Sequence, residues 1–267
     1  MMSPNMNGTP EERSGDSLTI EDAVALANLL VTLIHDIRNL TAAIQIKGDI
    51  LKMKPDKYDV TGLWNDLTPH LDKLDRLTLS ARDAVRWMRT PAEVVDEPTD
   101  VIASSKTCIA LLKRNAKSKE IRFHFDVSEE SIPVPLPKDL LEQGILIRLF
   151  ENAVMHGVKG STVVARFDRK GEKVRLQIAG RGEKVREDYV DRLVEDTDRE
   201  TLRRRGTAGE LGLGFGLYIA NRSALRFGGS IQVGTRPDPK AAQEEQPSTQ
   251  FFVTTLMLPS VLENTDE

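Results

Sequence analysis

The sequence has a single cysteine, no long apolar run and no excess of basic residues, and each shortage narrows what the chain can do. Because Cys108 is alone, an internal disulfide and a thiolate cluster for zinc are both excluded, which is typical of proteins from a reducing cytoplasm. The formal net charge of −4 gives no reason to expect DNA or an anionic membrane surface as the main partner. We therefore expect a cytoplasmic protein that does not bind nucleic acid.

The most apolar stretch, residues 23–34, is too short to cross a bilayer and contains Asn28 and Thr32. The first segment, MMSPNMNGTPEERSGDS, is polar and contains acidic residues, so it suits neither a signal peptide nor a transit peptide. We expect residues 1–17 to be a disordered tail and expect no membrane insertion.

Between residues 18 and 90, apolar and small residues recur three and four positions apart in two runs, separated by the turn-like segment MKPDKYDVTG. This spacing predicts a long antiparallel hairpin of two helices. Each helix carries more apolar residues than one partner can cover, so we expect a homodimer in which two hairpins form a four-helix bundle. The expected seam consists of Ile20, Ala23, Ala27, Leu30, Ile34, Ile37, Thr41, Ile44, Gly48 and Leu51, then Leu63, Leu67, His70, Leu74, Leu77, Ala81, Ala84 and Met88.

The remainder of the chain alternates helical and strand patterns. Residues 91–100, PAEVVDEPTD, are rich in proline and acids and are expected to be a linker. We predict helices over 101–119, 136–157 and 216–229, with strands over 120–127, 161–168, 173–180, 230–235 and 250–259. The fold class is therefore α+β: a helical hairpin followed by an α/β two-layer sandwich over 101–260, with 261–267 as a tail.

A glycine-rich stretch, GELGLGFGLYIAN, holds Gly212, Gly214 and Gly216 just before a helix expected to begin near Leu217. Glycines let backbone N–H groups approach a phosphate, and the positive end of a following helix favours the same anion. A flexible turn or a Rossmann loop would also be rich in glycine. A Rossmann loop, however, leaves a strand directly and meets an acidic residue about 20 positions later, and neither feature is present here.

Asn152 and His156 lie four residues apart in LIRLFENAVMHG, on one face of a predicted helix, with Glu151 beside them. This arrangement offers oxygen ligands for Mg²⁺ and an imidazole near phosphate. The alternative is that both side chains are satisfied by backbone groups near the end of the helix.

His35 follows the seam residue Ile34 in IHDIRN, so it is expected beside the dimer core and open to solvent, with Asn39 one turn later. A neutral imidazole is a good nucleophile at physiological pH, and Asp36 can hold its tautomer and stabilise the positive ring. A solvated surface histidine is the alternative. Among the other histidines, His70 lacks the adjacent acid and amide.

Taken in chain order, these motifs resemble those of two-component histidine kinases. The resemblance covers about residues 18–260 and includes a closing strand, TQFFVTTLMLP. HDIRN at 35–39 resembles the phosphoacceptor motif, and residues 151–153 with His156 resemble the asparagine-rich nucleotide box. GRG, with Gly180 and Gly182, resembles the first glycine box, and GLGFGL at 212–217 resembles the second.

The resemblance implies a soluble kinase with a GHKL-type ATP-binding domain. It would transfer a phosphoryl group from ATP to His35 and then to an aspartate of a response-regulator receiver domain. Asp36 would orient the imidazole, and Asn39 would position a water or the partner's aspartyl phosphate. Mg²⁺ would bind at Asn152, and the residues implied to bind ATP are Asn152, His156, Gly180, Gly182, Gly212, Gly214, Gly216 and Leu217.

The sequence also departs from the family pattern. Ile178 replaces the aspartate that accepts the adenine amino group, and an adenine amine without an acceptor costs roughly 1 to 3 kcal/mol. Arg148 replaces an asparagine that usually contacts magnesium. Leu193 and Val194 stand where aromatic residues of the lid are expected, and Leu40 stands where a proline usually follows the phosphoacceptor motif.

Two further hypotheses therefore stand beside the kinase. The chain would be a histidine phosphotransferase with a degenerate nucleotide domain, independent of ATP, if Ile178 and Arg148 abolish nucleotide binding. His35 would then relay phosphoryl groups between receiver domains. Alternatively, it would be a non-catalytic regulator that binds a kinase or response regulator through the hairpin. The kinase is our first hypothesis.

Overall fold

The computed structural model describes residues 97–183, 216–237 and 249–261, together with separate positions in the N-terminal region: 24, 27, 30, 31, 34, 37–39, 41, 42, 44–49, 62, 65, 68, 71, 78, 82, 85 and 86. Each of these separate positions has a helical backbone. The predicted residues His35, Asp36, Gly212 and Gly214 lie outside the described residues. The helical hairpin and its dimerisation therefore stay predictions.

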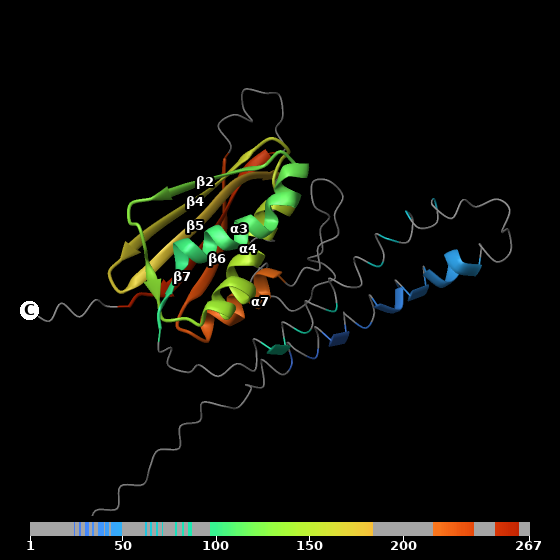
Figure 1. The fold of residues 1–267 in the computed structure, drawn as a ribbon, viewed down its shortest axis with the longest axis horizontal. Helices are drawn as coiled ribbons and strands as arrows, with labels where there is room; N and C mark the ends of the chain where they lie inside the picture. Colours follow the sequence, from blue (N-terminus) through green and yellow to red (C-terminus); the bar gives the residue numbers. More distant parts are fainter. Residues whose placement is uncertain are drawn as a thin grey trace, which may run out of the picture.

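From residue 99 to residue 259 the described chain alternates strands and helices (Figure 1). The elements are β1 (Thr99–Asp100), α3 (Val101–Ser118), β2 (Arg122–Val127), β3 (Pro133–Val134), η2 (Leu140–Leu146), α4 (Ile147–His156), β4 (Thr162–Lys170), β5 (Lys173–Glu183), α7 (Gly216–Leu225), β6 (Ser230–Pro237) and β7 (Thr249–Pro259). In the part that the structure describes, a five-stranded sheet has the order β2-β4-β5-β7-β6. β2 runs parallel to β4 and the other neighbours are antiparallel, so the predicted mixed α/β sandwich is confirmed.

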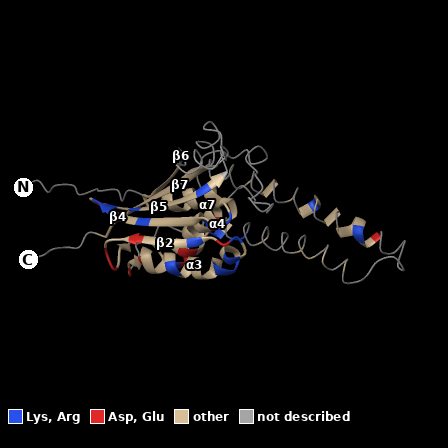
Figure 2. Cartoon of the chain, turned by 90° about the horizontal axis from the view of Figure 1, so that it is seen from above, with Lys and Arg blue, Asp and Glu red and all other residues tan. Residues whose placement is uncertain are grey.

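Helices α3, α4 and α7 pack against one face of this sheet (Figure 1). Strand side chains point alternately to the two faces, and those that meet the helices are apolar and buried. On β4 and β5 these are Val163, Ala165, Phe167, Val174, Leu176 and Ile178. The opposite face is polar, with ion pairs such as Arg166 with Asp126, and Figure 2 shows charges of both signs along β2 and β4.

The start of α3 is fixed by Asp100, whose Oδ1 accepts hydrogen bonds from Ile102 N at 2.9 Å and Ile132 N at 3.1 Å. The first of these caps the helix, and the second holds the chain that enters β3. β1 pairs with β3, so Thr99 and Asp100, at the end of the expected linker, are tied to the sandwich.

The segment from residue 140 to residue 156 forms two helix types in succession. η2 is a π-helix, and α4 continues from it without an interruption in the helical backbone. Phe150, in the middle of α4, is fully buried and packs edge-on against Phe123 of β2, with ring centroids 6.0 Å apart. The single helix predicted over 136–157 is thus a π-helix followed by an α-helix, and π-helical turns occur frequently at functional sites.

Among the described residues, an ion pair links the region of the predicted hairpin to the sandwich. Nη2 of Arg86 lies 3.3 Å from Oδ2 of Asp139, at the start of η2, and both side chains are exposed. Among the described helices, none is both long enough and apolar enough to span a membrane.

Candidate functional site

The nucleotide-box residues lie where the C-terminal end of α4 meets β5. Asn152 and His156 are half-buried on α4, and Gly157 ends the helix with an extended backbone. Gly157 then forms a β-bridge with Gly182, and Val158 N donates a hydrogen bond to Arg181 O at 2.9 Å. The end of α4 is therefore docked directly onto the strand that carries GRG.

Neighbouring atoms lie close to the backbone of both glycines of GRG, where a Cβ atom would stand. A Cβ atom at Gly180 would lie 3.2 Å from Cγ2 of Val163, and one at Gly182 would lie 3.2 Å from the carbonyl oxygen of His156. Earlier on the same side of β5, Leu176 and Ile178 carry buried side chains. The helix-facing side of β5 thus changes from apolar side chains to bare backbone as it reaches α4.

The third side of the site is the N-terminus of α7. Gly216 is the first residue of this helix, and a Cβ atom there would lie 3.9 Å from Cβ of Arg148 on α4. Asn221 fixes α7 to the sheet, because its Oδ1 accepts a hydrogen bond from Ile231 N of β6 at 3.0 Å. The N–H groups at the start of α7 and the positive end of its dipole suit a phosphate.

Lys119 is a positioning residue that sequence reasoning missed. Its side chain is buried, and Nζ donates hydrogen bonds to the carbonyl oxygens of Val154, at 3.2 Å, and Met155. These carbonyls belong to the last turn of α4, where helical N–H partners run out and a positive charge is favourable. In the sequence NAKSKE, nothing distinguishes Lys119 from the exposed Lys117.

Ile178 stands where the family has a carboxylate, and it is part of the core. Its side chain is 2% exposed and lies in register between Ala165 of β4 and Thr254 of β7. An isoleucine offers no acceptor to an adenine amine. Thr254 is buried and contributes the hydroxyl among these three paired residues. The sequence analysis missed it, since strand register is not visible in a single sequence.

Arg148 is also buried, with 8% of its surface exposed, and it lies one helical turn before Asn152. A guanidinium stays protonated in proteins, so a magnesium ion at Asn152 would lie close to a like charge in a poorly solvated place. Among the described residues, no three side chains of the types His, Cys, Asp and Glu gather as metal ligands. The charge of Arg148 thus favours a phosphate over a magnesium ion beside this part of α4.

Cys108 lies apart from these residues, on α3. Its Sγ donates a hydrogen bond to Glu142 O at 3.5 Å. Burial, and secondly the nearby charge of Glu142, raise the pKa of the thiol to about 12. The thiol is therefore protonated at neutral pH and is a poor nucleophile.

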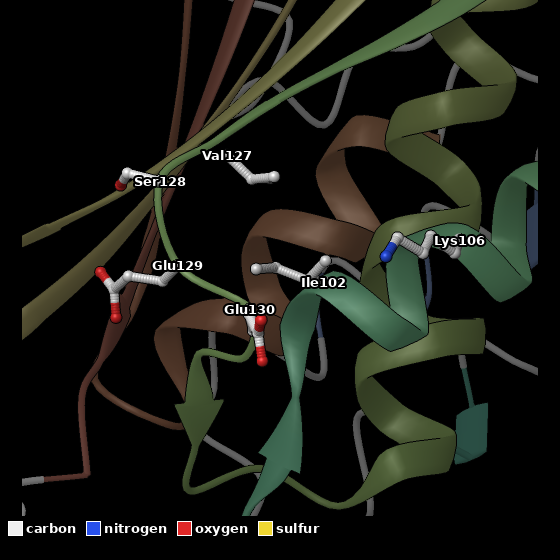
Figure 3. A pocket seen from close by; sticks show the side chains of 6 residues that line it. All are labelled: Ile102, Lys106, Val127, Ser128, Glu129 and Glu130. Atoms are coloured by element: carbon white, nitrogen blue, oxygen red, sulfur yellow. The ribbon is translucent and has the colours of Figure 1, made fainter.

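A separate hollow of about 370 Å³ lies between α3 and the segment after β2 (Figure 3). Its walls carry opposite charges, because Lys106 lies on one side and Glu129 and Glu130 on the other (Figure 3). Glu129 is already paired with Nε of Arg169 at 2.9 Å. The hollow shares no residue with the site formed by α4, β5 and α7.

Of the predicted nucleotide residues, the structure describes Asn152, His156, Gly180, Gly182, Gly216 and Leu217. Gly182 lies against the last turn of α4, and Gly216 lies against its first turn, at Arg148. Of the phosphoacceptor motif, Ile37, Arg38 and Asn39 are described; they have a helical backbone and are exposed. The roles assigned to His35, Asp36, Gly212 and Gly214 stay predictions.

Comparison with known proteins identifies the type of domain that carries these residues. The family described as "Histidine kinase-, DNA gyrase B-, and HSP90-like ATPase" matches residues 139–260. Sensor protein KdpD of Clostridium acetobutylicum is 24% identical over 236 residues, a match that covers 83% of this chain and 24% of KdpD. The chain therefore spans about a quarter of that relative's length.

Two solved structures share the fold. Histidine kinase ThkA in complex with the response regulator protein TrrA is similar with a TM-score of 0.67 and 19% identity, over 90% of this chain and 64% of that one. Full-length ShkA in complex with AMPPNP has a TM-score of 0.56 and 20% identity, over 86% of this chain and 45% of that one. With the family match over residues 139–260, this part of the chain is similar to the histidine kinase-like ATPase domains, and the chain as a whole is similar in sequence to a sensor protein of the two-component histidine kinase family.

Proposed function

We propose that the chain is a histidine kinase that transfers the γ-phosphoryl group of ATP to His35 and from there to an aspartate of a receiver domain. The observation that carries this proposal is the docking of α4 onto Gly182 beside the start of α7. It places Asn152 and His156 on one helix, α4, whose last turn contacts the bare backbone of Gly182 and whose first turn contacts Gly216 at the start of α7. The AMPPNP complex of ShkA and the response-regulator complex of ThkA support the same function by analogy.

The chain's own groups would bind and orient the nucleotide. Backbone N–H groups at the start of α7 would donate to phosphate oxygens, and the side chains of Asn152 and His156 would contact the phosphates from α4. Lys119 would act indirectly, because it holds the carbonyls of the last α4 turn and so fixes the position of His156. Catalysis of this kind is mostly positioning and charge stabilisation.

At His35, a neutral ring nitrogen would attack the γ-phosphorus of ATP. A nitrogen–phosphorus bond forms as the bond from phosphorus to the oxygen bridging the β-phosphate breaks, and ADP leaves. Asp36 would stabilise the positive ring and accept its proton. An oxygen of a receiver aspartate would then attack the same phosphorus. The nitrogen–phosphorus bond breaks as the oxygen–phosphorus bond forms, and the ring takes back its proton from Asp36. Asn39 would position that partner or a water.

We also propose that the chain is a homodimer through the hairpin. Leu30, Ile34 and Ile37 lie three or four residues apart at helical positions and are 40%, 64% and 37% exposed in the single chain. Apolar residues in such a row favour burial against another copy of the helix. Sedimentation of the chain and of Ile34→Glu tests this, since a dimer that uses this row would dissociate in the variant.

A second function is favoured by Ile178 and Arg148. Both depart from the family pattern, and Ile178 places a buried apolar side chain where that pattern has the carboxylate that accepts the adenine amine. A phosphotransferase that takes its phosphoryl group from one receiver domain and passes it to another would need His35 but no ATP.

Incubation with γ-labelled ATP separates the two functions. The kinase predicts labelling of the chain that is lost in His35→Gln and kept in the control His70→Gln. Labelling only from a phosphorylated receiver domain would show the phosphotransferase. If His35→Gln and the wild type behave alike with both donors, the chain is a non-catalytic regulator instead.

A further inference from the structure

Arg148 lies on α4 beside the start of α7, and the inference that follows rests on the proposed nucleotide binding. Its Cβ lies next to Gly216, where α7 begins, and Asn152 follows it by one turn of α4. The side chain is 8% exposed. From this backbone position, beside the start of α7 and one helical turn from Asn152, an extended arginine side chain is long enough to contact a ligand bound at either of them.

The charges in this region favour an anion over a divalent cation. A guanidinium is always protonated, is weakly hydrated and forms bidentate hydrogen bonds with phosphate oxygens. The N-terminus of α7 adds further positive potential at the same point. A magnesium ion on Asn152 would be repelled by both the guanidinium and the N-terminus of α7. Burial strengthens this repulsion because less water screens the charges.

We propose that Arg148 replaces the divalent cation, so that the chain binds nucleotide phosphates without magnesium. The guanidinium would contact the phosphate oxygens while the N–H groups at the start of α7 contact the same group from the other side. This assigns to Arg148 a binding role that the position does not have in the family pattern, where an asparagine contacts the metal.

The test is isothermal titration of ATP into the full chain, at constant ionic strength, with excess Mg²⁺ and then with EDTA. We expect the two dissociation constants of the wild type to agree within about threefold. Arg148→Gln should bind ATP at least about tenfold more weakly in EDTA, since it loses charge-assisted hydrogen bonds to phosphate. Lys106→Gln is the matched control: it removes a positive charge at the separate hollow of Figure 3 and should bind like the wild type.

A second variant keeps the test independent of how well Arg148→Gln folds. Arg148→Lys retains the charge but not the planar fork, so it should bind ATP in EDTA with reduced affinity. Wild-type binding that requires Mg²⁺ would overturn the role of Arg148 and leave the nucleotide site standing. Unchanged affinity of Arg148→Gln in EDTA would overturn it as well. No ATP binding with or without Mg²⁺ would overturn both this inference and the kinase.

Discussion

The carbonyl oxygen of His156 lies 3.2 Å from the point that a Cβ atom would occupy at Gly182. This approach accompanies the bridge between Gly157 and Gly182, which ends α4 against β5. Helix docking thus requires the second glycine of GRG before any ligand is considered. The motif positions the nucleotide-box residues as well as keeping the strand free of side chains near a phosphate.

Gly182→Ala should therefore disturb α4 and the site together. The new methyl group would push the last turn of the helix, at a cost of about 1 to 3 kcal/mol in the free energy of unfolding, and should weaken ATP binding. Denaturant unfolding and calorimetry measure the two effects. Gly234→Ala in β6 is the matched control, because a Cβ atom there meets nothing within 4 Å. Equal behaviour of the two variants would contradict the role given to this contact.

Replacing Lys119 by methionine should lower both stability and affinity. The change removes two hydrogen bonds to carbonyls at the end of α4, with an expected loss of roughly 2 kcal/mol in the free energy of unfolding. Lys117→Met, at an exposed position of the same segment, should change the unfolding free energy little. A Lys119→Met protein as stable as Lys117→Met would mean that the buried amine does not hold the helix.

Because of Ile178, we expect the chain to discriminate only weakly between adenine and guanine nucleotides. An acceptor for the adenine amine would distinguish ATP from GTP by roughly 1 to 3 kcal/mol, and a buried isoleucine provides none. We expect the dissociation constants for ATP and GTP to agree within about fivefold in competition titrations. A strong preference for ATP would show that another group, such as the Thr254 hydroxyl, recognises adenine.

The ion pair of Asp168 and Arg175 should make the free energy of unfolding depend on pH in the acid range. Nε of Arg175 donates to Oδ1 of Asp168 at 2.8 Å, and this hydrogen bond holds the pKa of Asp168 below its usual value. Because the folded pKa is lowered, the stabilisation is present above the unfolded pKa, about 3.9, and is lost as the pH falls through the folded pKa. Asp168→Asn should cost up to about 1 kcal/mol at pH 7 and nothing in strong acid.

Chemical unfolding of the wild type and of Asp168→Asn, at a series of pH values from neutral to acid, measures this difference in the free energy of unfolding. Glu120→Gln removes the more exposed ion pair with Lys159 and should have a smaller effect throughout. A difference between the wild type and Asp168→Asn that is the same at every pH would show that the carboxylate charge is not its source.

Much of the sandwich was predictable because its strands and helices bury one side. Val163, Ala165 and Phe167 alternate with outward-facing residues, and this period predicts β4 without knowledge of its neighbours. The short ribbon of β1 and β3 is too brief to show a period. The π-helical turns of η2 were not predicted either, since Leu140–Leu146 has the composition of an ordinary helix.

The site was predicted in its residue types and only partly in its contacts. Asn152, His156 and the glycines are recognisable by spacing, because helix geometry and close backbone approach restrict those positions. Lys119 and Thr254 owe their roles to long-range packing, which brings each of them to a distant element. Such contacts depend on strand register and on how the helices dock. Neither leaves a local signal in a single sequence.

The central claim is that His35 carries a phosphoryl group, and mapping the phosphorylated residue tests it most directly. The chain would be incubated with ATP or with a phosphorylated receiver domain, digested at alkaline pH to preserve phosphoimidazole, and analysed by mass spectrometry. The account predicts phosphate on the peptide that contains His35, and none in His35→Gln. Phosphate on another residue, or no phosphate from either donor, would contradict it.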